Sequence, residues 1–414
     1  MQIYIYRLLI NIITIFSPLI FLIRFFKKKE DLNRFKEKLT FFSKRRKMGK
    51  LIWFHSVSVG ELLSIVPLIR ILEKNKKISQ ILITSSTLTS ANLFKQFNFS
   101  KTIHQFFPID SNFLVKRFLN YWKPHLVIFI DSEIWPNMLL NLKKRSISTI
   151  LLNARISLKS YRKWKLLGSL SNKLFQTFTL TYPQNIESEK FLKKFNVKNI
   201  KKIGNLKFAQ NDLITKNLNK NLKQFLKSKK IWCAVSTHPG EEKISAEIHK
   251  RLLKKFRNLL LIIIPRHTYR IDEIKAELSE LKLNYHIHSN KKKITDKTNV
   301  YLVDTYGETG LFFDISKNIF MGKSFFIDGG QNPLEPARKN CKILYGPKVS
   351  NFKEIYKYLD DKKIAFKVKN QNNLYNRLNY LLDNTKKSSK NKNKLKIIGD
   401  KVLNKSVKEI EGFI

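Results

Sequence analysis

Short runs of apolar residues alternate with longer amphipathic stretches along most of the chain. In the first half, five apolar runs predict buried β-strands, at residues 51–56, 80–86, 103–108, 125–131 and 148–154. Helical periodicity follows the first of these runs over residues 61–75 and the third over residues 111–122. Strands that are apolar on both faces belong to parallel sheets covered by helices. The pattern therefore predicts a doubly wound α/β domain.

The same alternation starts again after a polar stretch, rich in Lys and Asn, from residue 210 to residue 230. Apolar runs then occur at residues 231–236, 259–264, 284–288, 299–304, 318–322 and 342–346, with helical patterns over 241–256, 269–281 and 351–359. This predicts a second doubly wound domain, with the boundary in the polar stretch. Residues 384–396 are dominated by Lys, Asn and Ser and predict a mobile tail before a closing helix.

An apolar run also opens the chain, from Leu8 to Ile23, and it ends in Arg24 and three lysines. The run is slightly shorter than the ~20 residues that span a bilayer core, and no cleavage site of small residues follows it. We interpret residues 1–26 as an uncleaved membrane anchor with the rest of the chain on the cytoplasmic side. A buried first helix and a kinked interfacial helix are the alternatives, and Pro18 favours either of them.

The composition is that of a folded and strongly basic protein. Of 414 residues, 43% are hydrophobic, and 80 Lys and Arg stand against 31 Asp and Glu, for a net charge of +49. Such a charge attracts acidic partners, so nucleic acid, an anionic membrane surface and phosphorylated substrates are all candidates. Cys233 and Cys341 lie far apart without metal-ligand spacing, and His238 has no second ligand near it. We therefore expect neither a disulfide framework nor a metal site.

Acidic and basic residues follow the predicted strands of the first half. Ligands of open α/β sheets bind outside the carboxyl ends of the strands. Glu61, Asp131 and Glu133 lie there, and a carboxylate is the group that would activate an acceptor hydroxyl. For Glu61 the alternative is a helix-start carboxylate that stabilises its own helix. Lys207 lies just before the predicted domain boundary and would supply a fixed cation, and the alternative for it is a solvated surface lysine.

The strand ends of the second half suit an anionic nucleotide. Arg266 follows a very apolar strand, where a guanidinium can pair with a phosphate. The stretches DTYGE (304–308) and DGGQNPLEP (328–336) join glycines to helix starts, whose backbone amides attract phosphate. Glu335 could accept hydrogen bonds from ribose hydroxyls. An exposed arginine and two ordinary capped helices are the alternatives.

Eight stretches together resemble the Kdo transferase family, the 3-deoxy-D-manno-octulosonate transferases of lipid A biosynthesis in Gram-negative bacteria. They are HSVSVGE (55–61), SEIWPN (132–137), NARIS (153–157), GNLKF (204–208), STHPGEE (236–242), PRH (265–267), DTYGE (304–308) and GGQNPLEP (329–336). The resemblance implies a GT-B enzyme of two Rossmann-like domains. Residues 27–215 would bind the acceptor and residues 216–414 the donor CMP-Kdo, after the anchor helix of residues 1–26.

The resemblance also implies the reaction, which is transfer of Kdo from CMP-Kdo to lipid IVA with inversion and without a metal or other cofactor. Glu61 would be the general base, and Asp131 and Lys207 would support the transition state. The CMP moiety would contact residues that follow strands of the second domain: Pro265, Arg266, Tyr306, Gly307, Glu308, Asn332, Pro333, Leu334 and Glu335.

Several positions depart from the family pattern. Asp131 stands where the family usually has Glu, so its carboxylate reaches one methylene less far. Tyr306 replaces a Met and Gln331 replaces a His. In the stretch 84–90, Leu88 and Ser90 replace a Pro and a Gly, which predicts a different shape for this loop on the acceptor side.

If the acceptor is a lipid, the apolar N-terminus and the net positive charge would serve the same function, which is to bring the protein to the membrane. Lipid IVA carries phosphates and lies in the membrane, so the basic residues near the N-terminus would hold the first domain against the anionic inner-membrane surface. These residues are Arg24, Lys27, Lys28, Lys29, Arg45 and Arg46. We expect the protein at the cytoplasmic face of the inner membrane.

Two other classes of protein are alternatives. The first is another nucleotide-sugar enzyme on the same scaffold, either a different lipid glycosyltransferase or an epimerase, because a fold does not determine a reaction. The apolar N-terminus disfavours a soluble epimerase. The second is a basic nucleic-acid-binding protein, which would interleave stacking aromatic residues with basic ones. The carboxylates at the strand ends argue against it, so we expect no nucleic-acid partner.

Overall fold

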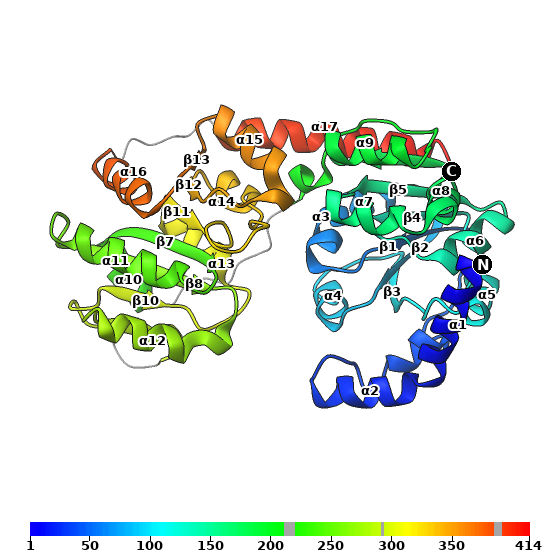
Figure 1. Ribbon diagram of the computed structural model, residues 1–414, viewed down its shortest axis with the longest axis horizontal. Helices are drawn as coiled ribbons and strands as arrows, with labels where there is room; N and C mark the ends of the chain where they lie inside the picture. The colour runs from blue at the N-terminus through cyan, green and yellow to red at the C-terminus, as the bar shows by residue number, and fades with distance from the viewer. Residues whose placement is uncertain (211–219, 291–293, 385–390) are drawn as a thin grey trace. The chain divides into compact units, whose positions relative to one another are not determined.

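The chain forms two compact units in the structure, a computed structural model that describes residues 1–210, 220–290, 294–384 and 391–414 (Figure 1). One unit consists of Met1–Asn211 with Ile398–Ile414, and the other of Asp212–Ile397. The predicted boundary between residues 215 and 216 lies outside the described residues.

A parallel sheet of six strands forms the centre of the first unit, in the order β3-β2-β1-β4-β5-β6. The strands are β1 (Lys50–His55), β2 (Ile78–Ser85), β3 (Thr102–Phe106), β4 (Leu126–Ile130), β5 (Ser148–Ala154) and β6 (Leu180–Pro183). The chain runs outward from β1 to β3 and then returns to the other side of β1 at β4. The strand order therefore reverses between β1 and β4, and such a switch point is where doubly wound folds bind ligands.

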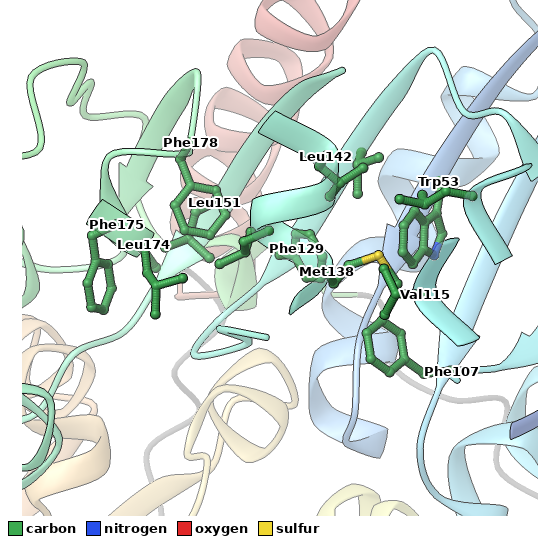
Figure 2. Packing of buried hydrophobic residues seen from close by; sticks show 14 of the residues in the cluster. Trp53, Phe107, Val115, Phe129, Met138, Leu142, Leu151, Leu174, Phe175 and Phe178 are labelled. Atoms are coloured by element: carbon green, nitrogen blue, oxygen red, sulfur yellow. The ribbon is translucent and has the colours of Figure 1, made fainter. Parts of the chain in front are cut away.

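Helices cover both faces of this sheet, because its central strands are apolar on both sides. They are α3 (Val59–Leu72), α4 (Leu88–Phe94), α5 (Asn112–Trp122), α6 (Pro136–Lys144), α7 (Leu158–Lys165), α8 (Gly168–Phe175) and α9 (Ile186–Lys194). Figure 2 shows the core on one face, where Trp53, Phe129 and Leu151 from three neighbouring strands pack with Met138 of α6 and Phe175 of α8. This packing holds the strand ends, and with them the candidate site, in fixed positions.

The last helix, α17 (Asn391–Glu411), ends on the first unit. Val402 and Ile410 are buried in the core on the other face of the first sheet. Glu409 accepts a hydrogen bond from Tyr182 at 2.7 Å and pairs with Lys201 at 2.9 Å. Assigning residues 398–414 to the second domain was therefore wrong: the sequence shows an amphipathic helix but not which sheet its apolar side covers.

Two helices, α1 (Gln2–Ile15) and α2 (Ser17–Phe26), take the place of the single helix predicted for residues 1–26. Pro18 lies in the first turn of α2, where a proline starts a new helix easily. Neither helix alone is long and apolar enough to cross a membrane; the pair, bent by 58°, passes this test of length and composition. Tyr6 of α1 donates a hydrogen bond to the buried Asp110 at 2.8 Å, and Arg7 donates one to Asn137 at 2.9 Å. Helix α1 is therefore fastened to the first unit by polar side chains.

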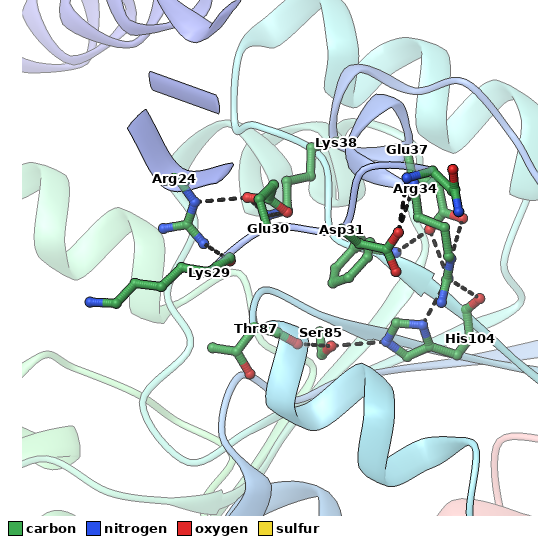
Figure 3. A network of polar contacts seen from close by, with 12 residues as sticks. Arg24, Lys29, Glu30, Asp31, Arg34, Glu37, Lys38, Ser85, Thr87 and His104 are labelled. Carbon is green, nitrogen blue, oxygen red and sulfur yellow. Dashed lines mark hydrogen bonds and ion pairs between the residues drawn. The ribbon is translucent and has the colours of Figure 1, made fainter. Parts of the chain in front are cut away.

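The segment after α2 is held by buried ion pairs, which Figure 3 shows. Glu30 is buried and accepts hydrogen bonds from Arg24 at 2.7 Å and from Lys38 at 2.6 Å. Glu37 pairs with Arg34, whose guanidinium also donates to the carbonyl oxygen of His104 in β3. Arg24, predicted to face the membrane surface, is therefore engaged within the protein.

The second unit contains a parallel sheet of seven strands, in the order β13-β12-β11-β7-β8-β10-β9. They are β7 (Lys230–Thr237), β8 (Leu259–Pro265), β9 (Tyr285–Ile287), β10 (Val300–Leu302), β11 (Asn318–Met321), β12 (Lys342–Tyr345) and β13 (Ala365–Lys367). The order reverses between β7 and β11, which is the switch point of this sheet. Two Rossmann-like, doubly wound bodies are thereby confirmed.

The helices described in the second unit are α10 (Lys220–Lys227), α11 (Glu241–Leu253), α12 (Ile271–Glu280), α13 (Thr309–Ile315), α14 (Leu334–Arg338), α15 (Lys353–Asp361) and α16 (Gln371–Asp383). Among them, α11, α12 and α15 match the predicted helical ranges, α13 and α14 begin at the two predicted helix starts, and α10 and α16 were not predicted. Of the predicted mobile tail, residues 385–390 lie outside the described residues, and residues 391–396 form the beginning of α17.

Candidate active site

Glu61 lies in the first turn of α3, just beyond the carboxyl end of β1. The hydroxyl of Ser58 accepts a hydrogen bond from the backbone N–H of Glu61 at 3.3 Å and donates one to Glu61 Oε1 at 2.8 Å. Glu61 Oε2 accepts a hydrogen bond from the backbone N–H of Val57 at 2.7 Å. This arrangement is close to a capping box, so the helix-capping alternative describes a real part of the role of Glu61.

The surroundings of Glu61 also make it a proton acceptor at neutral pH. Burial and the neighbouring charge of Asp131 raise the pKa of Glu61 to about 7, against the hydrogen bonds from Val57 and Ser58. A general base works best when its pKa lies near the working pH. Gly60 is exposed, and a Cβ built on it would meet nothing within 4 Å, so the turn beside Glu61 is open to a substrate.

The loop that holds Glu61 is fixed by the neighbouring strand end. The carbonyl oxygen of Val57 accepts hydrogen bonds from the hydroxyls of Thr87 at 3.1 Å and Ser90 at 3.0 Å. Ser90 is one of the departures from the family pattern. In this chain its hydroxyl holds Val57, whose backbone N–H donates a hydrogen bond to Glu61.

Asp131 follows β4 on the other side of the switch point, and its backbone has the left-handed angle φ 64°. It is 8% exposed, and within the described residues its Oδ1 atom has no hydrogen-bond partner. Its Oδ2 atom lies 3.9 Å from Lys207 Nζ. Burial raises the pKa of Asp131, whereas the positive charges of Lys207 and Arg155 act to lower it. The structure thus brings Asp131 and Lys207 together and places the charge of Asp131 within electrostatic reach of Glu61.

Asn153 explains how Lys207 reaches this site from a distant part of the sequence. Asn153 is buried at the end of β5, and its Oδ1 atom accepts a hydrogen bond from the backbone N–H of Leu206 at 3.0 Å. Asn205 Oδ1 accepts one from the backbone N–H of Lys207, also at 3.0 Å. The stretches NARIS and GNLKF therefore act as one positioning unit for the Lys207 side chain.

Glu133, the third acid of the first unit, faces a buried histidine. Its Oε2 atom accepts a hydrogen bond from Trp135 Nε1 at 2.9 Å and lies 3.5 Å from His55 Nε2. His55 is fully buried, and its Nδ1 atom is 2.9 Å from the hydroxyl of Thr84. Glu133 is thereby held by aromatic side chains of its own unit.

In the second unit, the predicted CMP-binding residues follow β8, β10 and β11 at the carboxyl edge of the sheet. Pro265 ends β8, and Arg266 is exposed directly after it. The hydroxyl of Tyr306 accepts a hydrogen bond from the backbone N–H of Thr268 at 3.2 Å. Tyr306 therefore connects the loop after β10 with the loop that carries Arg266.

The carboxylate of Glu308 is engaged within its own unit. Its Oε2 atom lies 2.9 Å from His288 Nε2, and the hydroxyl of Thr305 donates a hydrogen bond to it. Gly307, with φ 86°, makes the turn between Tyr306 and Glu308. Sequence reasoning missed His288, because nothing in a lone histidine after a short strand indicates that it meets Glu308.

The stretch 329–335 has the glycine conformations that its sequence suggests. Gly329 and Gly330 have φ 132° and φ 68°, which other residues rarely adopt. Asn332 Oδ1 accepts a hydrogen bond from the backbone N–H of Leu334 at 3.1 Å, across Pro333. Leu334 is fully buried, so its side chain packs in the core. Glu335 lies in the first turn of α14.

The expectation that two helix starts hold a phosphate is weakened by the length of these helices. Helix α13 has seven residues and α14 has five. A helix dipole is a sum over aligned peptide units, so such short helices offer little positive potential. Arg266 thus remains the main candidate among the predicted residues for neutralising a phosphate.

Glu241 organises this edge of the second sheet. It is buried, with 1% exposed, at the start of α11. Its Oε2 atom accepts hydrogen bonds from the backbone N–H groups of His238 at 2.9 Å and Lys323 at 2.7 Å. Its Oε1 atom accepts them from Ser324 at 2.9 Å and Phe325 at 3.0 Å. One carboxylate thus fixes the loops that follow β7 and β11.

No group of three or more His, Cys, Asp or Glu side chains in the part of the chain that the structure describes is placed to hold a metal ion.

Two solved structures that resemble this chain over most of its length are 2-epimerases. A putative UDP-N-acetylglucosamine 2-epimerase from Listeria monocytogenes has a TM-score of 0.58 at 11% identity, over 86% of this chain and 91% of that one. The UDP-GlcNAc 2-epimerase from Neisseria meningitidis has a TM-score of 0.57 at 13% identity, over 88% and 99%. At these identities the likeness establishes the GT-B-like α/β fold alone.

Relatives in sequence define the family. A family model described as 3-Deoxy-D-manno-octulosonic-acid transferase (kdotransferase) matches residues 33–210. The 3-deoxy-D-manno-octulosonic acid transferase of Rickettsia bellii is 35% identical over 99% of this chain and 98% of its own length. That of Haemophilus influenzae is 31% identical over 74% of this chain and 73% of its own length. The chain therefore belongs to the 3-deoxy-D-manno-octulosonic acid (Kdo) transferase family, whose members are glycosyltransferases.

Proposed function

We propose that this protein transfers Kdo from CMP-Kdo to a hydroxyl group of lipid IVA, with inversion and release of CMP. The observation that supports this most strongly is Glu61, a carboxylate with a pKa of about 7 at the switch point of the first sheet. Asp131 acts on Glu61 through its charge and lies 3.9 Å from Lys207, in a chain of the Kdo transferase family.

In the proposed reaction, Glu61 takes the proton of the acceptor hydroxyl while the hydroxyl oxygen bonds to the anomeric carbon of Kdo. The bond from that carbon to the phosphate oxygen breaks, and CMP leaves with the electron pair. Arg266 would neutralise the leaving phosphate, because a guanidinium binds phosphate through two parallel hydrogen bonds. Lys207 would keep Asp131 ionised, so that a fixed negative charge faces the developing positive charge on the sugar.

A pH profile tests the role of Glu61. Because a base must be deprotonated to act, kcat/KM should fall as the pH drops below the raised pKa of about 7 and level off above it. The measurement is kcat/KM for Kdo transfer between about pH 5 and about pH 9. A profile that stays flat down to the ordinary pKa range of a glutamate would contradict the assignment.

We propose further that α1 and α2 lie in the plane of an anionic membrane rather than across it. Exposed apolar side chains cover both helices, while Tyr6 and Arg7 tie α1 to the first unit. Lys27, Lys28 and Lys29 are exposed after α2 and would meet lipid phosphates. This arrangement corresponds to the kinked interfacial helix among the sequence alternatives, and it would bring the first unit to a lipid acceptor.

A double substitution, Leu9→Glu with Ile13→Glu, tests the membrane proposal without touching the contacts of Tyr6 and Arg7. These side chains are 55% and 44% exposed, and charged residues are unfavourable at a lipid interface. We expect the variant to lose most of its flotation with anionic vesicles while its affinity for CMP-Kdo is unchanged. Leu166→Glu, at a position 82% exposed, is the matched control. Flotation of the double variant at the wild-type level would show that the exposed apolar side chains of α1 do not bind the membrane.

The donor and the reaction class can be tested together by CMP release. The proposal predicts CMP from CMP-Kdo only when lipid IVA is present, because transfer needs both substrates. The epimerase alternative predicts turnover of UDP-N-acetylglucosamine without an acceptor, which NMR of the sugar would reveal. Epimerised sugar together with no acceptor-dependent CMP release would replace this proposal by that alternative.

A further inference from the structure

Lys323 has an unusual backbone for its position. It directly follows Gly322, after strand β11, and has φ 55°, a left-handed conformation that is costly for a residue with a Cβ. Other lysines with positive φ follow the ends of helices, where this conformation commonly ends the helix: Lys28, Lys123, Lys282 and Lys363. Lys323 is half-buried and follows a strand. A strained residue at a strand end is a reason to look for a function.

Lys323 lies at the switch point of the second sheet, between β11 and β7. Its backbone N–H and that of His238 donate to the same oxygen atom of Glu241, which places the two residues side by side. On the other side of β7, the backbone N–H of Arg266 donates to the carbonyl oxygen of Thr237 at 3.0 Å. Lys323, His238 and Arg266 therefore follow three adjacent strands at one edge of the sheet.

The Lys323 side chain extends over the glycine loop predicted to bind the nucleotide. A Cβ built on Gly329 would lie 3.3 Å from Lys323 Cε and 3.5 Å from Lys323 Nζ. The backbone N–H of Gly330 donates to the carbonyl oxygen of Lys323 at 2.9 Å. The ammonium group is therefore beside Gly329, within the same loop system as Asn332 and Glu335.

Lys323 and Arg266 have no carboxylate within salt-bridge distance among the described residues. Glu241 accepts four backbone hydrogen bonds, and Glu242 pairs with Arg270 at 2.7 Å. Burial, and then the charges of Lys323, His267 and Arg266, lower the pKa of His238 to about 4. Cations kept unpaired in this way favour a ligand that brings its own negative charges.

We propose that Lys323 binds the carboxylate of the donor sugar, as an anion subsite separate from the one that binds the phosphate. The inference rests on the proposed function, because CMP-Kdo carries a phosphate and a carboxylate on the same carbon of the sugar. Two long cationic side chains from opposite sides of β7 suit such a pair of anions: Arg266 binds the phosphate and Lys323 the carboxylate. Lys323 thereby distinguishes an acidic sugar from the bare nucleotide.

Two substitutions separate the charge of Lys323 from its backbone strain. Lys323→Gln removes the charge and keeps a Cβ at φ 55°, whereas Lys323→Gly removes both. Losing a charge-assisted contact to a carboxylate should weaken binding of CMP-Kdo by roughly 10- to 100-fold in both variants. Binding of CMP, which has no carboxylate, should change less than about threefold. Lys323→Gly should also raise the thermal unfolding midpoint, because glycine adopts this conformation without strain.

The experiment measures the dissociation constants of CMP and CMP-Kdo by calorimetry for the wild-type chain and the two variants. Lys282→Gly is the matched control, since it makes the same change at φ 55° after α12, and we expect it to bind both ligands like the wild type. Equal weakening of CMP and CMP-Kdo, or no weakening of either, would overturn the assignment of Lys323 while the proposed donor stands. A wild-type chain that binds CMP but not CMP-Kdo would overturn both the donor and this inference.

Discussion

Replacing Glu61 by Gln is expected to lower kcat for Kdo transfer by ~10²- to 10⁴-fold, the usual contribution of a general base. The amide retains the shape of the carboxylate and can still accept a hydrogen bond from the backbone N–H of Val57, but it cannot take up a proton. Binding of CMP should be unchanged, because the predicted CMP contacts lie in the other unit. Steady-state kinetics together with calorimetry of CMP binding measure both quantities.

The capping role of Glu61 requires a control. Glu187 lies in the first turn of α9, as Glu61 does in α3, but it is not in the loops that follow β1 and β4. Glu187→Gln should therefore reproduce any loss from a weakened helix start and leave kcat at the wild-type level. Near-normal turnover of Glu61→Gln would assign the proton transfer to another group. A similar loss in both variants would reduce Glu61 to a capping residue.

The second large effect is expected at Glu241, whose carboxylate accepts hydrogen bonds from the backbone N–H groups of four residues in two loops. In Glu241→Gln, an NH₂ group replaces one of the two carboxylate oxygens. The backbone N–H groups that donated to that oxygen then lose their acceptor. Leaving buried donors unsatisfied costs ~1–3 kcal/mol each, so we expect the free energy of unfolding of the second unit to fall by ~2–4 kcal/mol.

Denaturant titration measures this loss, and hydrogen exchange locates it in residues 322–326. Glu247, on the same helix, is half-buried and accepts a hydrogen bond from the Gln371 side chain at 2.7 Å. Glu247→Gln should change the free energy of unfolding by less than ~0.5 kcal/mol, as surface substitutions usually do. Unchanged protection of residues 322–326 in Glu241→Gln would show that the loops do not depend on this carboxylate.

The apolar runs predicted most of the sheet strands because strands buried on both faces have few polar residues. The strands that escaped prediction, β6 and β13, have four and three residues, and runs this short do not stand out from their surroundings. The strand order, with its two switch points, could not be predicted from the sequence either, because adjacency in a sheet depends on crossovers between distant segments.

For the candidate site, residue type and place after a strand made Glu61 and Asp131 candidates, and the family resemblance assigned catalytic roles to them and to Lys207. The contacts that bring these residues together could not be predicted from the sequence, because they join distant segments of the chain. One example is the hydrogen bond between Asn153 and the backbone of Leu206. The sequence did not single out Lys323, because it is one of many lysines in a strongly basic chain. Its left-handed backbone angle is known only from the structure.

The mass of the lipid product shows whether the protein transfers Kdo to lipid IVA. The protein is incubated in anionic vesicles that contain lipid IVA, CMP-Kdo is added, and the extracted lipid is weighed by mass spectrometry. We expect lipid IVA to become heavier by one or more Kdo units, with an equal amount of CMP released, and no such gain with Glu61→Gln over the same time. Lipid IVA of unchanged mass, in vesicles where a transferase known to act on lipid IVA adds Kdo, would contradict the proposed function.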